Sequence, residues 1–196
     1  MNIEDRVRVV LKSIDNLGKV IYTIKKNNTI QSTILDITGE IVNALRNDKK
    51  VLLCGNGGSA ADAQHIAAEF SGKFYKDREP LYAEALHVNT SYLTAVANDY
   101  SYDEIYSRLI KAKGRQGDIL IAISTSGNSK NIVNAINTAN HIGMITIGLT
   151  GAKKCLMDTV CKYLIKIPSE DTPRIQESHI LIGHIICEII EKEIFG

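Results

Sequence analysis

The stretch Val51-Leu-Leu-Cys-Gly-Asn-Gly-Gly-Ser-Ala60 decides the fold. An apolar run ends in a glycine-rich loop, and a helical pattern begins directly after the loop. This order is typical of a buried strand joined to a helix by a tight turn. Such a turn places backbone N–H groups and a helix N-terminus where an anionic ligand can bind. His65 and Glu69 follow on the same helix, four residues apart and therefore on one face.

The rest of the chain alternates between short apolar runs and helical patterns. Further strands are predicted at 83–88, 118–124, 144–149 and 163–167. Helices are predicted at 60–71, 90–97, 102–112 and 129–142, with a long terminal helix that has Thr172 as its N-cap and Pro173 at its first position. Apolar strands that alternate with helices predict an α/β fold: a five-stranded parallel doubly wound sheet, flavodoxin-like, flanked by helices. Ligands of such sheets bind beyond the carboxyl ends of the strands.

The first 48 residues predict two amphipathic helices ahead of the first strand, separated at Asn27-Asn28-Thr29. Two such helices need a surface to cover, either the sheet or another subunit. At 196 residues, the chain is expected to form a single domain, 1–196, with 1–48 as an N-terminal helical extension.

Composition excludes several classes of function. The formal net charge of +1 gives no electrostatic footprint for nucleic acid or for an anionic membrane. No apolar run is long enough to cross a membrane, and the first residues do not resemble a signal peptide. The cysteines form no CxxC pair and are expected to be reduced; they are Cys54, Cys155, Cys161 and Cys187. We therefore expect a cytoplasmic protein with a small-molecule ligand, and neither nucleic acid nor membrane as a partner.

A second loop, Ser124-Thr125-Ser126-Gly127-Asn128-Ser129, joins the most apolar strand to a helix. Its four hydroxyls and its N–H groups at a helix N-terminus suit a phosphate monoester. The alternative is a hydroxyl-rich N-cap, but capping needs fewer hydroxyls. The first loop, 55–59, is neither a dinucleotide fingerprint nor a P-loop. It fits either a simple tight turn or the close approach of a sugar or phosphate.

The terminal helix carries Gln176 and His184 on one row of an otherwise apolar helix. Buried polar side chains need partners, and a site shared with His65 and Glu69 would satisfy all four. Two histidines, a glutamate and a glutamine could hold a zinc-like divalent ion. Equally, Glu69 and His184 could form a metal-free acid–base pair. Spacing does not decide between these, and the pair Asn98-Asp99 by itself indicates only a turn.

Four motifs together resemble the sugar isomerase (SIS) domain family and, within it, the phosphoheptose isomerases. They are Cys-Gly-Asn-Gly-Gly-Ser-Ala-Ala-Asp-Ala-Gln-His at 54–65, Thr-Ala-Val-Ala-Asn-Asp at 94–99, Ile-Ser-Thr-Ser-Gly-Asn-Ser at 123–129, and Arg-Ile-Gln-Glu-Ser-His at 174–179, running on to His184. The resemblance covers nearly the whole chain. It implies a doubly wound sheet and a homotetramer with active sites at subunit interfaces. The implied reaction is isomerisation of sedoheptulose 7-phosphate to D-glycero-D-manno-heptose 7-phosphate through an enediol, the first step toward the heptose of lipopolysaccharide or related surface glycans.

The resemblance also implies roles for individual residues. One zinc ion per subunit is implied, on His65, Glu69, Gln176 and His184. Glu69 and His184 are the implied catalytic pair, with Glu69 expected at the carbon proton and His184 at the oxygens. Contacts with the sugar phosphate substrate are implied for Asn56, Gly57, Gly58, Ser59, Glu69, Asn98, Asp99, Ser124, Thr125, Ser126, Ser129 and Gln176. The hydroxyl loop would anchor the phosphate and so position the reacting end.

Two alternatives remain within this fold. One is a non-catalytic SIS-fold protein that binds the replication initiator. That relative is similar in both loops but lacks the acidic residue matching Glu69 and the imidazole matching His184, so their presence here favours catalysis. The other is a relative that senses or isomerises a different sugar phosphate, such as a hexose phosphate. The heptose-specific motifs argue against it.

Overall fold

The computed structural model describes residues 1–196 and is built around one parallel sheet. The five strands lie in the order β2-β1-β3-β4-β5. They are β1 (Val51–Gly55), β2 (Ala83–Ala85), β3 (Ile119–Ile123), β4 (Ile145–Thr150) and β5 (Tyr163–Lys166). Every residue of β1 and β3 is buried, as expected for strands covered on both faces. The predicted α/β fold with a five-stranded parallel doubly wound sheet is confirmed.

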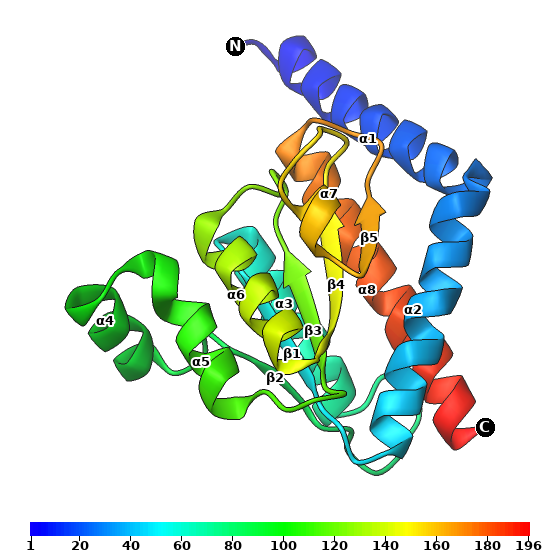
Figure 1. Ribbon diagram of the computed structural model, residues 1–196. Coiled ribbons are helices and arrows are strands. Elements are labelled where there is room, and N and C mark those ends of the chain that lie inside the picture. Colours follow the sequence, from blue (N-terminus) through cyan, green and yellow to red (C-terminus); the bar gives the residue numbers. More distant parts are fainter.

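Helices cover both faces of the sheet (Figure 1). One layer consists of α1 (Ile3–Lys26), α2 (Asn28–Arg46), α3 (Gly58–Ser71) and α8 (Thr172–Phe195). The other consists of α4 (Thr90–Asp99), the 3₁₀ turn η1 (Tyr102–Glu104), α5 (Ile105–Lys113), α6 (Lys130–Ile142) and α7 (Met157–Val160). Alternate strand residues serve the two layers: Val51 and Leu53 pack toward the first, Leu52 and Cys54 toward the second.

Most element ends lie within one to three residues of the prediction, and three differences have a clear local cause or add an element. The second strand ends at Ala85, because it is an edge strand that pairs only with β1 and only as far as Leu53. The short helix α7 was not predicted. Helix α8 starts at Thr172, so Asp171 takes the N-cap position that was assigned to Thr172, and Pro173 is the second helical residue rather than the first.

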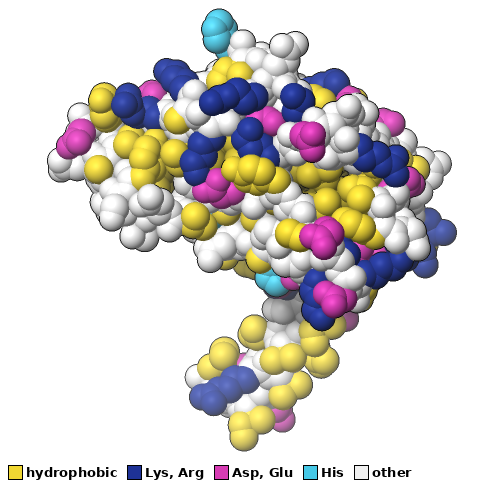
Figure 2. Space-filling model, turned by 90° about the horizontal axis from the view of Figure 1, so that it is seen from below, with side chains coloured by type: hydrophobic (Ala, Val, Ile, Leu, Met, Phe, Trp, Pro, Cys, Tyr) yellow, Lys and Arg dark blue, Asp and Glu magenta, His cyan; other side chains and the backbone are white.

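The two N-terminal helices differ sharply in burial. Helix α2 is part of the core, and Ile37 and Ile41 are fully buried. Helix α1 buries only Val20 and Ile24, both near its end. Leu17 is half-buried, and the other large apolar side chains are exposed: Ile3, Val7, Val9, Val10, Leu11, Ile14, Ile21 and Tyr22. Figure 2 shows hydrophobic side chains along an arm that stands away from the body. None of the helices has the length and apolar character that crossing a membrane requires.

Candidate active site

The candidate site is expected at the point of the sheet where successive strands begin to be added on the opposite side of β1. In the order β2-β1-β3-β4-β5, the helix after β1 packs on one face of the sheet and the helix after β3 packs on the other. The carboxyl ends of β1 and β3 therefore flank the switch point at which such sheets bind ligands. The last residues of these strands, Gly55 and Ile123, lie in register. The first loop follows Gly55 and the second follows Ile123. The two glycine- and hydroxyl-rich loops predicted from the sequence are therefore neighbours.

His65, Glu69 and His184 form one cluster between α3 and α8. The Nε2 atoms of the two imidazoles are 3.1 Å apart, and His65 Nε2 is 3.2 Å from Glu69 Oε1. One potential ligand atom from each of the three residues lies within 4.8 Å of the other two. The structure thus joins residues separated by 119 positions in the chain. Sequence spacing predicted the His65–Glu69 pair and placed His184 with it.

The close packing of α3 on α8 brings the two histidines together. A Cβ at Gly183, next to His184, would lie 2.5 Å from Ile66 Cδ1, next to His65. A side chain at position 183 would therefore force Ile66 or the helix to shift. The sequence analysis missed Gly183, because a glycine inside a helix carries no signal of what it faces.

Asp62 lies one turn before His65 on α3. Its Oδ2 is buried without a hydrogen-bond partner. Burial raises the pKa of the Asp62 carboxyl to about 6, while nearby His65 lowers it. Asp62 therefore adds a third titratable group to the face of α3 that carries His65 and Glu69.

Gln176 lies beside the first loop. A Cβ at Gly58 would be 2.5 Å from Gln176 Nε2, so the loop backbone and the amide are in direct contact. Gln176 stands two turns before His184 on the same helix, α8. The structure therefore places three of the four predicted metal ligands in one cluster, and the fourth on α8 against the first loop.

Asn56 in the first loop is held by two residues that the sequence analysis missed. Asn56 and Asn131 exchange two amide hydrogen bonds of 2.9 Å, and the Tyr102 hydroxyl donates to Asn56 Oδ1 at 3.1 Å. Asn131 is buried at the start of α6. A polar residue on the buried face of α6 was the available signal. This network fixes the direction of the Asn56 amide.

Asn98 and Asp99 lie at the exposed end of α4. The Asn98 amide donates to Asp99 Oδ1 at 2.9 Å, and neither side chain contacts another predicted site residue. Tyr102, three residues after Asp99, reaches Asn56 and brings this segment to the edge of the first loop. The pair is thus linked to the first loop through Tyr102, and its contact with the substrate stays a prediction.

The second loop is organised by its own hydroxyls. Ser124 Oγ is 3.2 Å from Ser129 Oγ and 3.4 Å from Ser126 Oγ, and it accepts from the Gly127 N–H at 3.2 Å. Beside the loop is a small hollow of about 140 Å³. Its lining residues are Thr125, Ser126, Gly151, Ala152, Lys153, Glu170, Thr172 and Ile175. The hydroxyls of Thr125, Ser126 and Thr172 line this hollow together with Lys153 and Glu170. The loop itself leads into the start of α6, and hydroxyls at a helix N-terminus suit a phosphate group.

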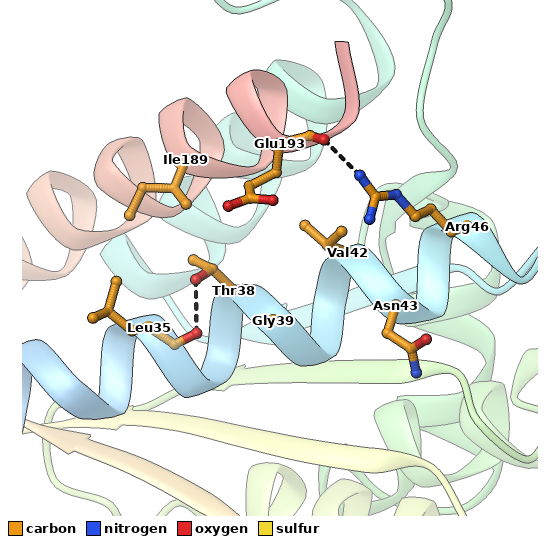
Figure 3. Close-up of a pocket in the computed structure, with 8 residues that line it drawn as sticks. All are labelled: Leu35, Thr38, Gly39, Val42, Asn43, Arg46, Ile189 and Glu193. Carbon is orange, nitrogen blue, oxygen red and sulfur yellow. Dashed lines mark hydrogen bonds between the residues drawn. The ribbon is translucent and has the colours of Figure 1, made fainter. Parts of the chain in front are cut away.

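A larger hollow of about 430 Å³ lies between α2 and α8. In Figure 3, Arg46 donates to the Glu193 carbonyl across it, at 2.6 Å. Its lining residues are Leu35, Thr38, Gly39, Val42, Asn43, Arg46, Ile189 and Glu193. None of these is a predicted site residue, so this groove is separate from the candidate active site.

This fold, with a His–Glu–His cluster and a hydroxyl-rich loop at the end of β3, is that of a sugar-phosphate-handling class of α/β protein. The family model described as SIS domain matches residues 14–151, and the chain belongs to the SIS domain family. Within that family its relatives are phosphoheptose isomerases. The phosphoheptose isomerase of Clostridium acetobutylicum is 54% identical over 173 residues, 88% of each chain. Phosphoheptose isomerase 2 of Campylobacter jejuni is 51% identical, over 88% of this chain and 86% of the relative.

A solved structure agrees with these relatives. The structure of phosphoheptose isomerase from Neisseria gonorrhoeae is 38% identical, with a TM-score of 0.89. The match covers 97% of this chain and 100% of that one. The resemblance inferred from the motifs is confirmed.

Proposed function

We propose that this chain is an aldose–ketose isomerase that converts sedoheptulose 7-phosphate to D-glycero-D-manno-heptose 7-phosphate. The observation that carries the proposal is the His65–Glu69–His184 cluster between α3 and α8, in a fold whose β3 ends in a hydroxyl-rich loop. Relatives that share about half of their residues with this chain bear the name phosphoheptose isomerase. A non-catalytic role in binding the replication initiator is not favoured, because Glu69 and His184 are both present and lie in one cluster.

The reaction moves a proton between C1 and C2 through an enediol. A carboxylate is a suitable base for the carbon proton, and we assign this step to Glu69. An imidazole can both give and take a proton near neutral pH, and we assign the proton transfers at the oxygens to His184. Ser124, Ser126 and Ser129, with Thr125, would hold the phosphate and so position the far end of the sugar. Asn56, Gly57, Gly58 and Ser59, with Gln176 and the pair Asn98–Asp99, are proposed as the remaining substrate contacts.

The donor set of the cluster fits a zinc ion. Two ligands of a tetrahedral zinc ion lie about 3.3 Å apart, given metal–nitrogen bonds of about 2.0–2.1 Å. The separations of 3.1 and 3.2 Å in the cluster are close to this value. We propose His65, Glu69 and His184 as ligands, with Gln176 as the fourth. A bound ion would polarise the carbonyl and stabilise negative charge on the enediol oxygens.

Further parts of the proposal concern the whole protein. We propose a homotetramer with active sites at subunit interfaces, supported by the exposed apolar face of α1. We propose one domain, 1–196, in which 1–48 is a helical extension, supported by the packing of α2 into the core of the sheet layer. A cytoplasmic location is supported by four cysteines without a disulfide. The product would supply heptose for lipopolysaccharide or a related surface glycan.

The test is a direct assay. Purified protein is incubated with sedoheptulose 7-phosphate, with and without a chelator, and the aldose product is measured. We expect turnover that the chelator removes and added zinc restores. Glu69→Gln should lower kcat by about 10²-fold or more while the fold is kept, since a positioned base contributes roughly that much. Absence of aldose with the zinc-loaded wild type, or full activity of Glu69→Gln, would contradict the proposal.

A further inference from the structure

We propose that Arg78 and Glu191 are positioning residues of this site. Their buried ion pair locks the segment 72–78 between α3 and α8 and so holds Phe74 against the His184 ring. The inference rests on the proposed function, because it assigns these residues an effect on isomerase turnover.

Glu191 on α8 binds the backbone of segment 72–78. Its carboxylate accepts from the N–H groups of Phe74, Tyr75 and Lys76 at 3.2, 2.9 and 3.0 Å. Arg78 Nε donates to the same carboxylate at 3.1 Å. Burial alone would raise the pKa of Glu191, but the three backbone donors and Arg78 together hold it below its usual value. Glu191 is therefore an anion whose lone pairs are directed at one short segment.

Arg78 fixes the other side of the segment to α3. Its guanidinium donates to the carbonyl oxygens of Glu69, Phe70 and Gly72 at 2.9, 2.8 and 3.3 Å. These carbonyls belong to the C-terminal end of α3, which lacks partners within the helix and favours a positive charge. One of them is the main-chain carbonyl of Glu69 itself. Arg78 thus ties the backbone of the proposed base to the anion on α8.

The hydrogen bonds of Glu191 and Arg78 to segment 72–78 and to α3 act as a clamp. Phe74 links this clamp to His184. Its ring centroid is 5.8 Å from that of His184, whose other neighbour is the His65 ring at 5.1 Å. The imidazole therefore lies between an aromatic ring and its partner in the cluster. Because Glu191 binds the Phe74 N–H directly, the clamp fixes the backbone that carries this ring.

An ion pair is an unusual choice for holding two helices together. Only 4% and 3% of the Arg78 and Glu191 side chains are exposed. Apolar side chains of similar size commonly hold helices as well as buried ion pairs do. The charged pair differs from an apolar contact because its hydrogen bonds are directional. They fix the positions of particular backbone groups, such as the Phe74 N–H and the Glu69 carbonyl. Directional placement beside a reacting group points to catalysis rather than to stability alone.

The test compares Arg78→Lys, Glu191→Gln and Phe74→Leu with the wild type in the isomerase assay. Each variant is assayed well below its thermal midpoint. We expect kcat to fall about tenfold, because misplaced groups in a reacting site commonly cost this much or more. We expect KM to change by less than about threefold, because the phosphate loop is not touched. In Glu191→Gln, the amides of 74–76 should also exchange with deuterium faster.

Glu40→Gln is the matched control. It removes another inter-element ion pair, between Glu40 on α2 and Lys162 at 2.6 Å, away from the cluster, and should keep the wild-type kcat. Phe74→Leu keeps the clamp and an apolar side chain, so it tests the idea even if the buried-pair variants fail to fold. A wild-type kcat in Phe74→Leu, or a loss that appears only in KM, overturns the inference. A wild type without turnover would instead overturn the proposed function.

Discussion

His179 is a wholly buried imidazole one turn before Gly183 on α8. Neither ring nitrogen reaches a partner in good hydrogen-bonding geometry. Burial lowers the pKa of His179 to about 4, against a smaller opposing effect of the Thr150 backbone. The side chain is thus neutral in the folded protein at ordinary pH. The 174–179 motif contains His179 but does not indicate its burial, because burial of a polar side chain is a property of the fold.

This burial predicts a pH dependence of stability. The unfolded chain binds a proton at His179 near pH 6.5, whereas the folded chain binds it only near pH 4. Between these values the unfolded state holds more protons, so the free energy of unfolding falls as the pH falls. The contribution is about 3 kcal/mol when complete. Urea unfolding of the wild type and His179→Gln at several pH values checks it.

The variant should lack this part of the pH slope. His141→Gln is the control, because His141 is exposed on α6 and its replacement should leave the slope unchanged. Equal slopes for the wild type and His179→Gln between pH 4 and 6.5 would show that His179 is not buried in its neutral form.

At the scale of the element, the approach of α8 to α3 assembles the cluster. Gly183→Ala places a methyl group 2.5 Å from Ile66 Cδ1, so Ile66 or the helix must move. Overpacking of this kind costs about 1–3 kcal/mol. We expect lower stability together with a lower kcat, because His65 and His184 lie on either side of the contact. Thermal unfolding and the isomerase assay measure both.

Gly39→Ala is the matched substitution. Gly39 is also inside a helix, but a Cβ there meets nothing within 4 Å. Removing a mid-helix glycine should stabilise α2 by up to about 1 kcal/mol and leave kcat unchanged. If Gly183→Ala behaved like Gly39→Ala, close packing of α8 on α3 would not be what brings the histidines together.

The elements themselves were largely predictable. Strands such as 118–124 are continuous apolar runs, and α6 and α8 follow clear start signals, so local pattern and tertiary structure agree. The cluster of His65, Glu69 and His184 was predictable because helical spacing pairs the first two and a polar His184 on an apolar helix needs partners. Asn131, Gly183 and Arg78 were not. Their roles depend on which side chain of a distant element faces them, and spacing within one segment does not contain that information.

At the scale of the whole molecule, α1 is the helix whose apolar face is left mostly uncovered by the other elements of the chain. Its apolar side chains face solvent, although a surface helix normally buries such a stripe. Arg174 fixes the helix in place through a 2.6 Å hydrogen bond to the Ser13 carbonyl. The stripe is thus held in a defined direction and is suited to packing against another copy.

Leu11→Glu tests this arrangement, because Leu11 is 58% exposed and a charge there costs an isolated chain little. We expect the variant to sediment as a smaller species than the wild type while the circular dichroism spectrum is kept. Lys12→Glu, on an exposed neighbouring position, should sediment like the wild type. A monomeric wild type, or a Leu11→Glu variant of unchanged mass, would contradict the proposed assembly.

The position of α8 outside the sheet has a further consequence. The strands pair only with each other, whereas His184 is supplied by a helix that packs on one face of them. Partial unfolding that releases α8 would therefore dismantle the site and leave the strand ladder intact. Turnover reports on the docking of one helix, and a preparation can keep its β-sheet signal while a fraction of its molecules is inactive. Active-site titration, rather than the amount of folded sheet, counts the competent molecules.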